Sequence, residues 1–160
     1  MTNPLDLNAP VDTLAMEFTR DFDAPVEALF RAHAEPELVK QWLGPRDLEM
    51  TIEHWNFKSG GGYRYVHKAD RGEFGFNGVY HKVRENEFII QTFEFEGAPD
   101  MVNIEFIWFE DLGNGRSRLR AQSLVDSFES RDAWLRSGME TGVEQGYAKL
   151  DAVLAAEATQ

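Results

Sequence analysis

The chain has 160 residues, of which 42% are hydrophobic and 12% aromatic, so it is long and apolar enough for one globular domain. Its 28 acidic and 16 basic residues give a formal net charge of -12, which disfavours nucleic acid and anionic membranes as partners because both would be repelled. The lack of cysteine excludes disulfides, thiolate metal sites and cysteine nucleophiles. We expect a cytoplasmic protein, because no apolar run approaches the roughly 20 residues that span a bilayer and the acidic start is unlike a secretory signal.

The beginning of the chain predicts an arm followed by one strand. Residues 1–12 contain prolines and no hydrophobic period, which indicates a loose arm, and residues 13–157 are expected to form a single domain. Apolar residues alternate over residues 14–22, and this alternation predicts the first strand.

Two short helices are predicted after this strand. The first covers residues 25–34, with Pro25 in the first turn, where its missing N–H group costs nothing. The second covers residues 35–43 and ends at Gly44-Pro45, since both residues are helix-terminating signals.

From residue 48 the hydrophobic period changes to two, which predicts β-strands. Turn residues separate the segments, and connections this short allow only antiparallel neighbours. The Ser59–Gly62 segment is interpreted as one of these turns rather than a phosphate-binding loop, because no Lys-Ser/Thr pair and no helix follow it. Six strands are predicted, over residues 48–57, 62–69, 73–84, 87–96, 101–110 and 116–125.

Two of the six strands have one clearly apolar face. In the fifth, apolar residues that include Phe106 and Trp108 alternate with Asn103 and Glu105, and in the sixth, Leu119 alternates with arginines. We therefore expect Phe106, Trp108 and Leu119 to face the interior. The pattern does not orient the other four strands.

The stretch from Glu129 to Ala156 predicts one long helix, because its apolar residues recur at the three-to-four spacing of a single helical face. A helix of about 27 residues is ~40 Å long, enough to cross a sheet. Gly138, Gly142 and Gly146 lie within this apolar face. Each glycine in a helix interior costs roughly 1 kcal/mol relative to alanine, so either close backbone packing or room for a bound molecule must offset the loss.

This order of elements is typical of the α+β class. A strongly curved sheet around one helix cannot be filled by backbone, so its interior holds either large side chains or a cavity.

Several short segments, taken together and in order, carry a family resemblance. They are Asp23-Ala24-Pro25 through Leu29-Phe30, Glu35-Pro36-Glu37-Leu38 through Trp42-Leu43-Gly44-Pro45, Gly61-Gly62-Tyr63-Arg64-Tyr65, Gly78-Val79-Tyr80, Gln91-Thr92-Phe93-Glu94, and Ser137-Gly138-Met139 through Gly146-Tyr147 and Leu150. From Leu14 to Leu154 the chain resembles the START-like (SRPBCC, helix-grip) superfamily, and more narrowly its AHSA-type branch, named after the activator of the heat-shock chaperone ATPase. The resemblance implies a helix-grip fold, in which a curved antiparallel sheet wraps around the C-terminal helix and encloses a mostly apolar cavity.

Relatives in this superfamily bind small hydrophobic molecules, cyclise or aromatise polyketides, or assist a chaperone, so the resemblance implies the fold more closely than the function. We expect binding of a small hydrophobic molecule without a cofactor, by a monomer or a homodimer. A cyclase or aromatase on the same cavity is the first alternative, and His54 and Glu94 are the only candidates for its polar residue. A chaperone ATPase cofactor is the second and is disfavoured, because relatives with that role carry an additional N-terminal domain for which the arm is too short.

The residues expected to line the cavity come from four strands and from the last helix. They are His54, Phe93, Phe106, Trp108, Leu119, Trp134, Gly138, Met139 and Gly142. The aromatic members fit an ordinary core equally well, and the glycines favour a cavity.

The remaining polar residues give weaker indications. His54 lies mid-strand among apolar residues, whereas His67 and His81 lie near turns and are expected at the surface. No metal site is expected, because the histidines lack the spacing of metal ligands. Carboxylate pairs such as Glu105 with Glu110 are expected by chance in so acidic a chain, and no catalytic role is assigned to them.

Overall fold

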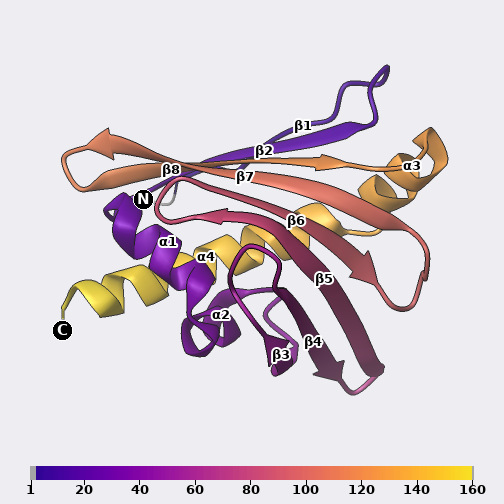
Figure 1. The fold of residues 1–160 in the computed structure, drawn as a ribbon, viewed down its shortest axis with the longest axis horizontal. Helices are drawn as coiled ribbons and strands as arrows, with labels where there is room; N and C mark the ends of the chain where they lie inside the picture. Colours follow the sequence, from indigo (N-terminus) through magenta and orange to yellow (C-terminus); the bar gives the residue numbers. More distant parts are fainter. Residues whose placement is uncertain (1–2, 160) are drawn as a thin grey trace.

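The structure is a computed structural model that describes residues 3–159 of the chain. Within these residues one antiparallel sheet of eight strands curves around the helices, which confirms the predicted α+β class (Figure 1). The elements are β1 (Asp6–Asn8), β2 (Ala15–Phe22), α1 (Val26–Ala34), α2 (Pro36–Trp42), β3 (Glu49–Trp55), β4 (Gly62–Ala69), β5 (Gly72–Arg84), β6 (Phe88–Phe95), β7 (Val102–Gly113), β8 (Arg116–Leu124), α3 (Phe128–Arg136) and α4 (Met139–Ala158).

The strands lie in the order β1-β2-β8-β7-β6-β5-β4-β3. The six strands β3 to β8 are therefore a continuous antiparallel meander, as the short connections predicted. β2 pairs with β8 in a register that runs from Ala15 opposite Leu124 to Phe22 opposite Ser117. This pairing brings the start of the chain beside the end of the meander and leaves one face of the sheet for α1, α2 and α4 (Figure 1).

β1 lies in the segment where the sequence indicated a loose arm. It pairs with β2, and the Arg131 guanidinium donates hydrogen bonds to the carbonyl oxygens of Ala9 and Pro10. An edge strand of three residues is held by backbone hydrogen bonds and needs no hydrophobic period, so the sequence pattern does not reveal it.

The predicted long helix is interrupted. Ser127 caps the N-terminus of α3, since its hydroxyl accepts a hydrogen bond from the Ser130 backbone N–H at 3.0 Å, and the chain turns at Gly138 between α3 and α4. Gly138 has a φ of 83°, a left-handed conformation that suits glycine. The interior-helix cost expected for this glycine therefore does not arise, and α4, with 20 residues, still crosses the sheet. No helix within residues 3–159 is both long and apolar enough to cross a membrane.

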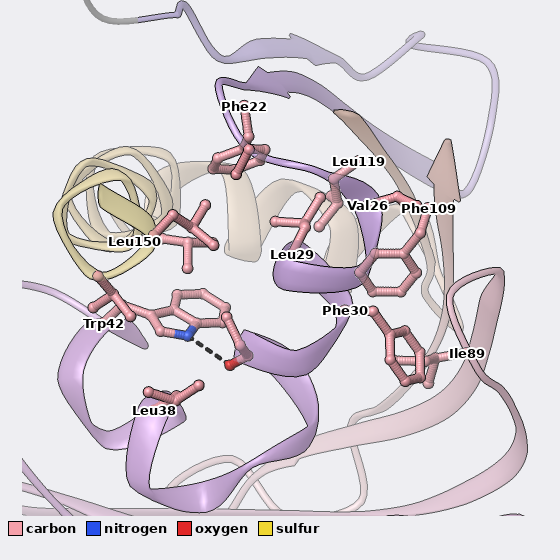
Figure 2. Close-up of a cluster of buried hydrophobic side chains, with 14 of the residues drawn as sticks. Phe22, Val26, Leu29, Phe30, Leu38, Trp42, Ile89, Phe109, Leu119 and Leu150 are labelled. Carbon is pink, nitrogen blue, oxygen red and sulfur yellow. Dashed lines mark hydrogen bonds between the residues drawn. The ribbon is translucent and has the colours of Figure 1, made fainter. Parts of the chain in front are cut away.

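A densely packed core fills the end of the interior beneath α1. Phe22, Leu29, Leu119 and Leu150 converge there from β2, α1, β8 and α4, and all four are at most 1% exposed (Figure 2). The Trp42 indole of α2 closes one side of this core and donates a hydrogen bond to the Ala32 carbonyl oxygen at 2.9 Å (Figure 2).

The facing predicted for β7 is wrong, whereas that of β8 is correct. Asn103 and Glu105 face the helices, and Phe106 and Trp108 lie on the outer face of the sheet, where their rings stack with centroids 6.0 Å apart. The Arg120 guanidinium covers the Trp108 ring at 4.7 Å, so part of this apolar face is shielded from water. Alternation alone misled the prediction because the inner face here borders a cavity, which accepts polar side chains.

Candidate ligand-binding cavity

A cavity of about 540 Å³ lies between the inner face of the sheet and the N-terminal half of α4. Its other walls are the connection from α2 to β3, which includes Gly44 and Pro45, and the C-terminal part of α3. This volume falls in the range of roughly 300–1,000 Å³ that is typical of small-molecule sites.

Aromatic side chains of β4 and β5 form one wall of the cavity. The Tyr63 and Tyr65 rings stack on β4 with centroids 6.0 Å apart, and Tyr65 stacks on Phe76 of β5 at 5.1 Å. The Tyr63 hydroxyl donates a hydrogen bond to the Thr92 carbonyl oxygen at 2.7 Å, which fixes its ring across β5. Burial raises the pKa of Tyr65, so this phenol stays neutral and the wall is an uncharged aromatic surface.

Five of the nine predicted residues meet at one end of the cavity. Phe93 on β6 contacts Trp134 on α3 edge to face at 5.9 Å, and Gly138, Met139 and Gly142 line the adjoining wall at the start of α4. The structure therefore brings these five predicted residues together on the wall of one cavity.

The two glycines inside α4 have different surroundings. A Cβ atom on Gly142 would find a single heavy atom within 4 Å, Cδ of Pro45 at 3.8 Å. A Cβ atom on Gly146 would lie 3.1 Å from the Trp42 carbonyl oxygen and 3.4 Å from the Gly44 backbone nitrogen. Gly146 therefore permits close packing of α4 on the end of α2, and Gly142 leaves space beside the cavity. The close backbone packing offered as one explanation occurs at Gly146, and the open space that the other explanation requires lies at Gly142.

Four predicted residues do not line the cavity. His54 is exposed, because a bulge in β3 between Ile52 and His54 shifts the alternation so that Trp55 faces the interior instead. Phe106 and Trp108 belong to the outer face of β7, and Leu119 lies in the packed core.

Two histidines that the sequence analysis did not assign to the site line the cavity. His67 is 4% exposed rather than at the surface, because it continues the inward-facing series of Tyr63 and Tyr65 along β4. Its Nδ1 atom has no hydrogen-bond partner among the described residues. Burial lowers the pKa of His67 to about 4, so the imidazole is neutral near pH 7. The period of two along β4 was the signal that could have placed it.

His33 approaches the cavity from α1. Its Nδ1 atom lies 2.9 Å from the Leu29 carbonyl oxygen and therefore donates to it, since a carbonyl oxygen can only accept. The ring packs edge to face against Trp42 at 4.8 Å and Phe109 at 5.1 Å. Burial lowers the pKa of His33 to about 4 as well, so both cavity histidines are uncharged at neutral pH.

A polar group lies on the sheet side of the cavity. The Gln91 amide on β6 donates a hydrogen bond to the Glu105 carboxylate on β7 at 2.8 Å. Ser123 is directly opposite Glu105 on β8, is 4% exposed, and its hydroxyl has no partner among the described residues. Burial raises the pKa of Glu105, and the hydrogen bond from Gln91 opposes that shift.

Glu94, the carboxylate that the sequence analysis named for the enzyme alternative, does not line the cavity. Its side chain accepts a hydrogen bond from the Asp100 backbone N–H at 2.9 Å, near the turn after β6. The carboxylate that does reach the interior is Glu105, which the sequence analysis set aside because acidic pairs are frequent in this chain. Within residues 3–159 no group of three or more histidine, aspartate or glutamate side chains is arranged to hold a metal ion.

Comparison with known proteins agrees with the architecture. The model of the family described as Activator of Hsp90 ATPase homolog 1-like protein matches residues 23–155. A crystal structure of a protein from Rhodobacter sphaeroides is 26% identical, with a TM-score of 0.86 over 96% of this chain and 99% of that one.

Two further solved structures are similar in fold. A protein from Arthrobacter aurescens has a TM-score of 0.86 at 23% identity, covering 94% of this chain and 91% of that one. The AHSA1 protein from Silicibacter pomeroyi has a TM-score of 0.73 at 22% identity, covering 89% of this chain and 99% of that one. Among curated proteins, none matches the chain.

Proposed function

Because the chain belongs to the family of Activator of Hsp90 ATPase homolog 1-like proteins, within the START-like superfamily, we propose that it binds a small, mostly hydrophobic molecule in the cavity between its sheet and α4. The fold of this superfamily supports many functions, so the proposal depends on the cavity itself rather than on the family.

The observation that carries the proposal is the combination of an aromatic wall with buried polar atoms that lack partners. His67 Nδ1, Ser123 Oγ and Trp134 Nε1 all belong to residues that line the cavity, and none has a hydrogen-bond partner among the described residues. A buried polar atom without a partner costs about 1–3 kcal/mol. A molecule that pairs with them while its apolar body covers the aromatic rings would remove this cost, and burial of its surface contributes roughly 25 cal/mol per Å².

Retained ligand is the most direct test. Native mass spectrometry of freshly purified protein should show a population heavier than the bare chain by the mass of one small molecule. Titration with Nile red, a neutral apolar dye, should then show saturable binding of one dye per chain and a blue-shifted emission.

Two variants on neighbouring residues of α4 locate the binding site. Met139→Trp fills the cavity and should weaken Nile red binding at least tenfold, whereas Glu140→Trp adds the same ring at an exposed position and should leave binding unchanged. Equal loss of binding in both variants, or a wild-type protein without saturable binding, contradicts the proposal.

A cyclase or aromatase remains the second candidate for the same cavity. It is favoured by one observation, the presence of the Glu105 carboxyl group and the His67 imidazole on the cavity wall. Groups with pKa values shifted by burial are frequent where protons are exchanged with a bound molecule. In that case ligand binding would be the first step of the reaction, so the experiments above precede any test of turnover.

A further inference from the structure

Glu105 belongs to a row of side chains that crosses the inner face of the sheet from strand to strand. Paired residues place Ser123 of β8, Glu105 of β7, Gln91 of β6 and Tyr80 of β5 directly beside one another. Side chains opposite each other in antiparallel strands have Cβ atoms about 4.5–5.5 Å apart, so Ser123 and Gln91 are the nearest neighbours of the carboxylate across the sheet, and Tyr80 lies one strand further. All of them are uncharged.

The basic residues around the cavity are engaged elsewhere. Arg20 makes two hydrogen bonds to the Asp151 carboxylate, at 2.9 and 2.7 Å. Lys149 Nζ donates to the Pro45 carbonyl oxygen at 3.3 Å.

Arg71, on the cavity wall near the α2–β3 connection, pairs with Asp47 at 3.0 Å. None of the ion pairs among the described residues includes Glu105. Among residues 3–159, the Gln91 amide is thus the only hydrogen-bond donor to this carboxylate, and no cation pairs with it.

A carboxylate that faces a cavity without a neighbouring cation can reach a stable state in two ways. It can take up a proton, or it can meet a cation that enters the cavity, because an isolated charge away from water is unfavourable. The rise in the pKa of Glu105 shows that its surroundings disfavour the charge, and the hydrogen bond from Gln91 favours it. A positively charged ligand would provide the missing partner.

The rings around Glu105 suit a cation as well. Tyr63 and Tyr65 of β4 and Tyr147 of α4 line the same cavity as Glu105. Burial is the main cause of the raised pKa of each of these phenols, and the negative charge of Glu105 adds to it. Aromatic faces attract ammonium groups, most strongly where water is excluded. The formal net charge of -12 also attracts cations toward the protein and repels anions.

We propose that the molecule bound in the cavity is a hydrophobic amine, whose ammonium group lies beside Glu105 while its apolar or aromatic body covers the rings of β4, β5 and β6. This inference rests on the proposed function, since it names the chemical class of the ligand for the same cavity.

Three probes with the same naphthalene body test the inference: naphthylethylamine, naphthylethanol and naphthylacetate, which are cationic, neutral and anionic near pH 7. Isothermal titration calorimetry should show that the amine binds the wild type at least tenfold more tightly than the alcohol. Tenfold corresponds to about 1.4 kcal/mol. The acid should bind most weakly.

Substitutions in this row of side chains then test whether the Glu105 carboxylate causes the preference for the amine. Glu105→Gln should lower the affinity for the amine to that for the alcohol and change the affinity for the alcohol less than threefold. Glu94→Gln, on the neighbouring strand but outside the cavity, is the matched control and should retain the preference for the amine. Gln91→Lys provides an internal ammonium beside Glu105, so it should also abolish the preference, and it tests the inference if Glu105→Gln does not fold.

Equal affinity of the wild type for the amine and the alcohol would overturn the inference, and so would a preference for the amine that survives in both Glu105→Gln and Gln91→Lys. The proposed function would stand in these cases, because the cavity would still bind an apolar body. If neither the three probes nor Nile red binds the wild type, both the inference and the proposed function fail.

Discussion

α4 passes through two interiors that are filled in different ways. Its C-terminal half places Leu150, Val153 and Leu154 in the packed core, whereas its N-terminal half presents Gly142 and Val143 to the cavity. The inner face of the sheet also differs between these two regions.

At the packed end the strands contribute Phe109 and Leu119 to the hydrophobic core, and at the cavity end they contribute Gln91, Glu105 and Ser123 to the wall. Burying a polar side chain without a hydrogen-bond partner is unfavourable, so polar side chains on the inner face occur beside the cavity rather than in the packed core.

Tyr147 lies between the two regions. Its ring contacts Phe22 of the packed core edge to face at 5.6 Å and stacks on Trp42 at 6.0 Å. The adjacent Arg20–Asp151 ion pair, with Arg20 only 4% exposed, fixes α4 to β2 at the same level. The packed end thus holds α4 in place, and the cavity end leaves space beside the helix.

The largest expected difference concerns truncation of a large side chain at each end. Leu150→Ala removes a fully buried side chain from the packed core and should lower the free energy of unfolding by about 2–5 kcal/mol. Met139→Ala removes a partly buried side chain from the cavity wall and should cost less than about 1 kcal/mol, since it enlarges a space that already exists. Chemical denaturation of both variants measures the two changes, and similar losses would contradict the division of the interior.

Acid should weaken the protein through His33, which borders both regions. The pKa of this buried imidazole is about 4 in the folded protein, against an ordinary value of 6.5. The unfolded chain therefore takes up a proton first as the pH falls, and stability is lost between about pH 6.5 and pH 4. From about pH 7 to about pH 5 the loss attributable to this histidine is about 2 kcal/mol.

His33→Phe removes the titrating group and should flatten this part of the stability profile, measured as the free energy of unfolding at several pH values. His67, whose pKa is also lowered to about 4, contributes in the same direction and keeps the variant from becoming fully independent of pH. His81→Asn, at an exposed position of β5, is the control and should follow the wild type. A variant with the full wild-type slope would show that His33 is not responsible.

The sequence was informative where periodicity and turn signals act locally. It predicted the meander, the two short helices and the α+β class, and five of the nine residues that it assigned to a cavity lie on the cavity wall. Gly138 was assigned to the interior of a single helix, because spacing does not reveal a left-handed residue between two helices. The family resemblance was also correct, since the family model covers residues 23–155.

The facing of strands was the part that local patterns could not provide. The alternation in β7 places Phe106 inside only if the apolar face is the buried one, and here a cavity reverses that rule and admits Glu105. His54 was misplaced by a bulge, which depends on pairing with β4 rather than on residue type. A polar residue inside a cavity is thus the feature that a hydrophobic pattern is least able to find.

The smallest expected changes in stability concern the two glycines within α4, and they are opposite in sign. Gly146→Ala brings a Cβ atom to 3.1 Å from the main-chain oxygen of Trp42, which cannot move without displacing the end of α2. Overpacking of this kind costs roughly 1–3 kcal/mol, and the gain in helix propensity of about 1 kcal/mol offsets only part of it. Gly142→Ala meets a single side-chain atom at an ordinary 3.8 Å, so the same gain should leave this variant as stable as the wild type or up to about 1 kcal/mol more stable.

A larger residue at Gly142 separates stability from binding. Gly142→Leu extends into the cavity from a helix position where a Cβ atom finds room, so the melting temperature should stay near that of the wild type while the affinity for Nile red falls. Thermal melts and dye titrations of Gly142→Ala, Gly142→Leu and Gly146→Ala measure both quantities on one helix. All three variants could instead be destabilised, with dye binding that only follows the fraction of folded protein. That result would mean that α4 is packed equally tightly along its whole length and that the cavity is not a binding site. A stable Gly142→Leu variant that no longer binds the dye would place the bound molecule beside the first turns of α4, in the cavity that Glu105 also lines.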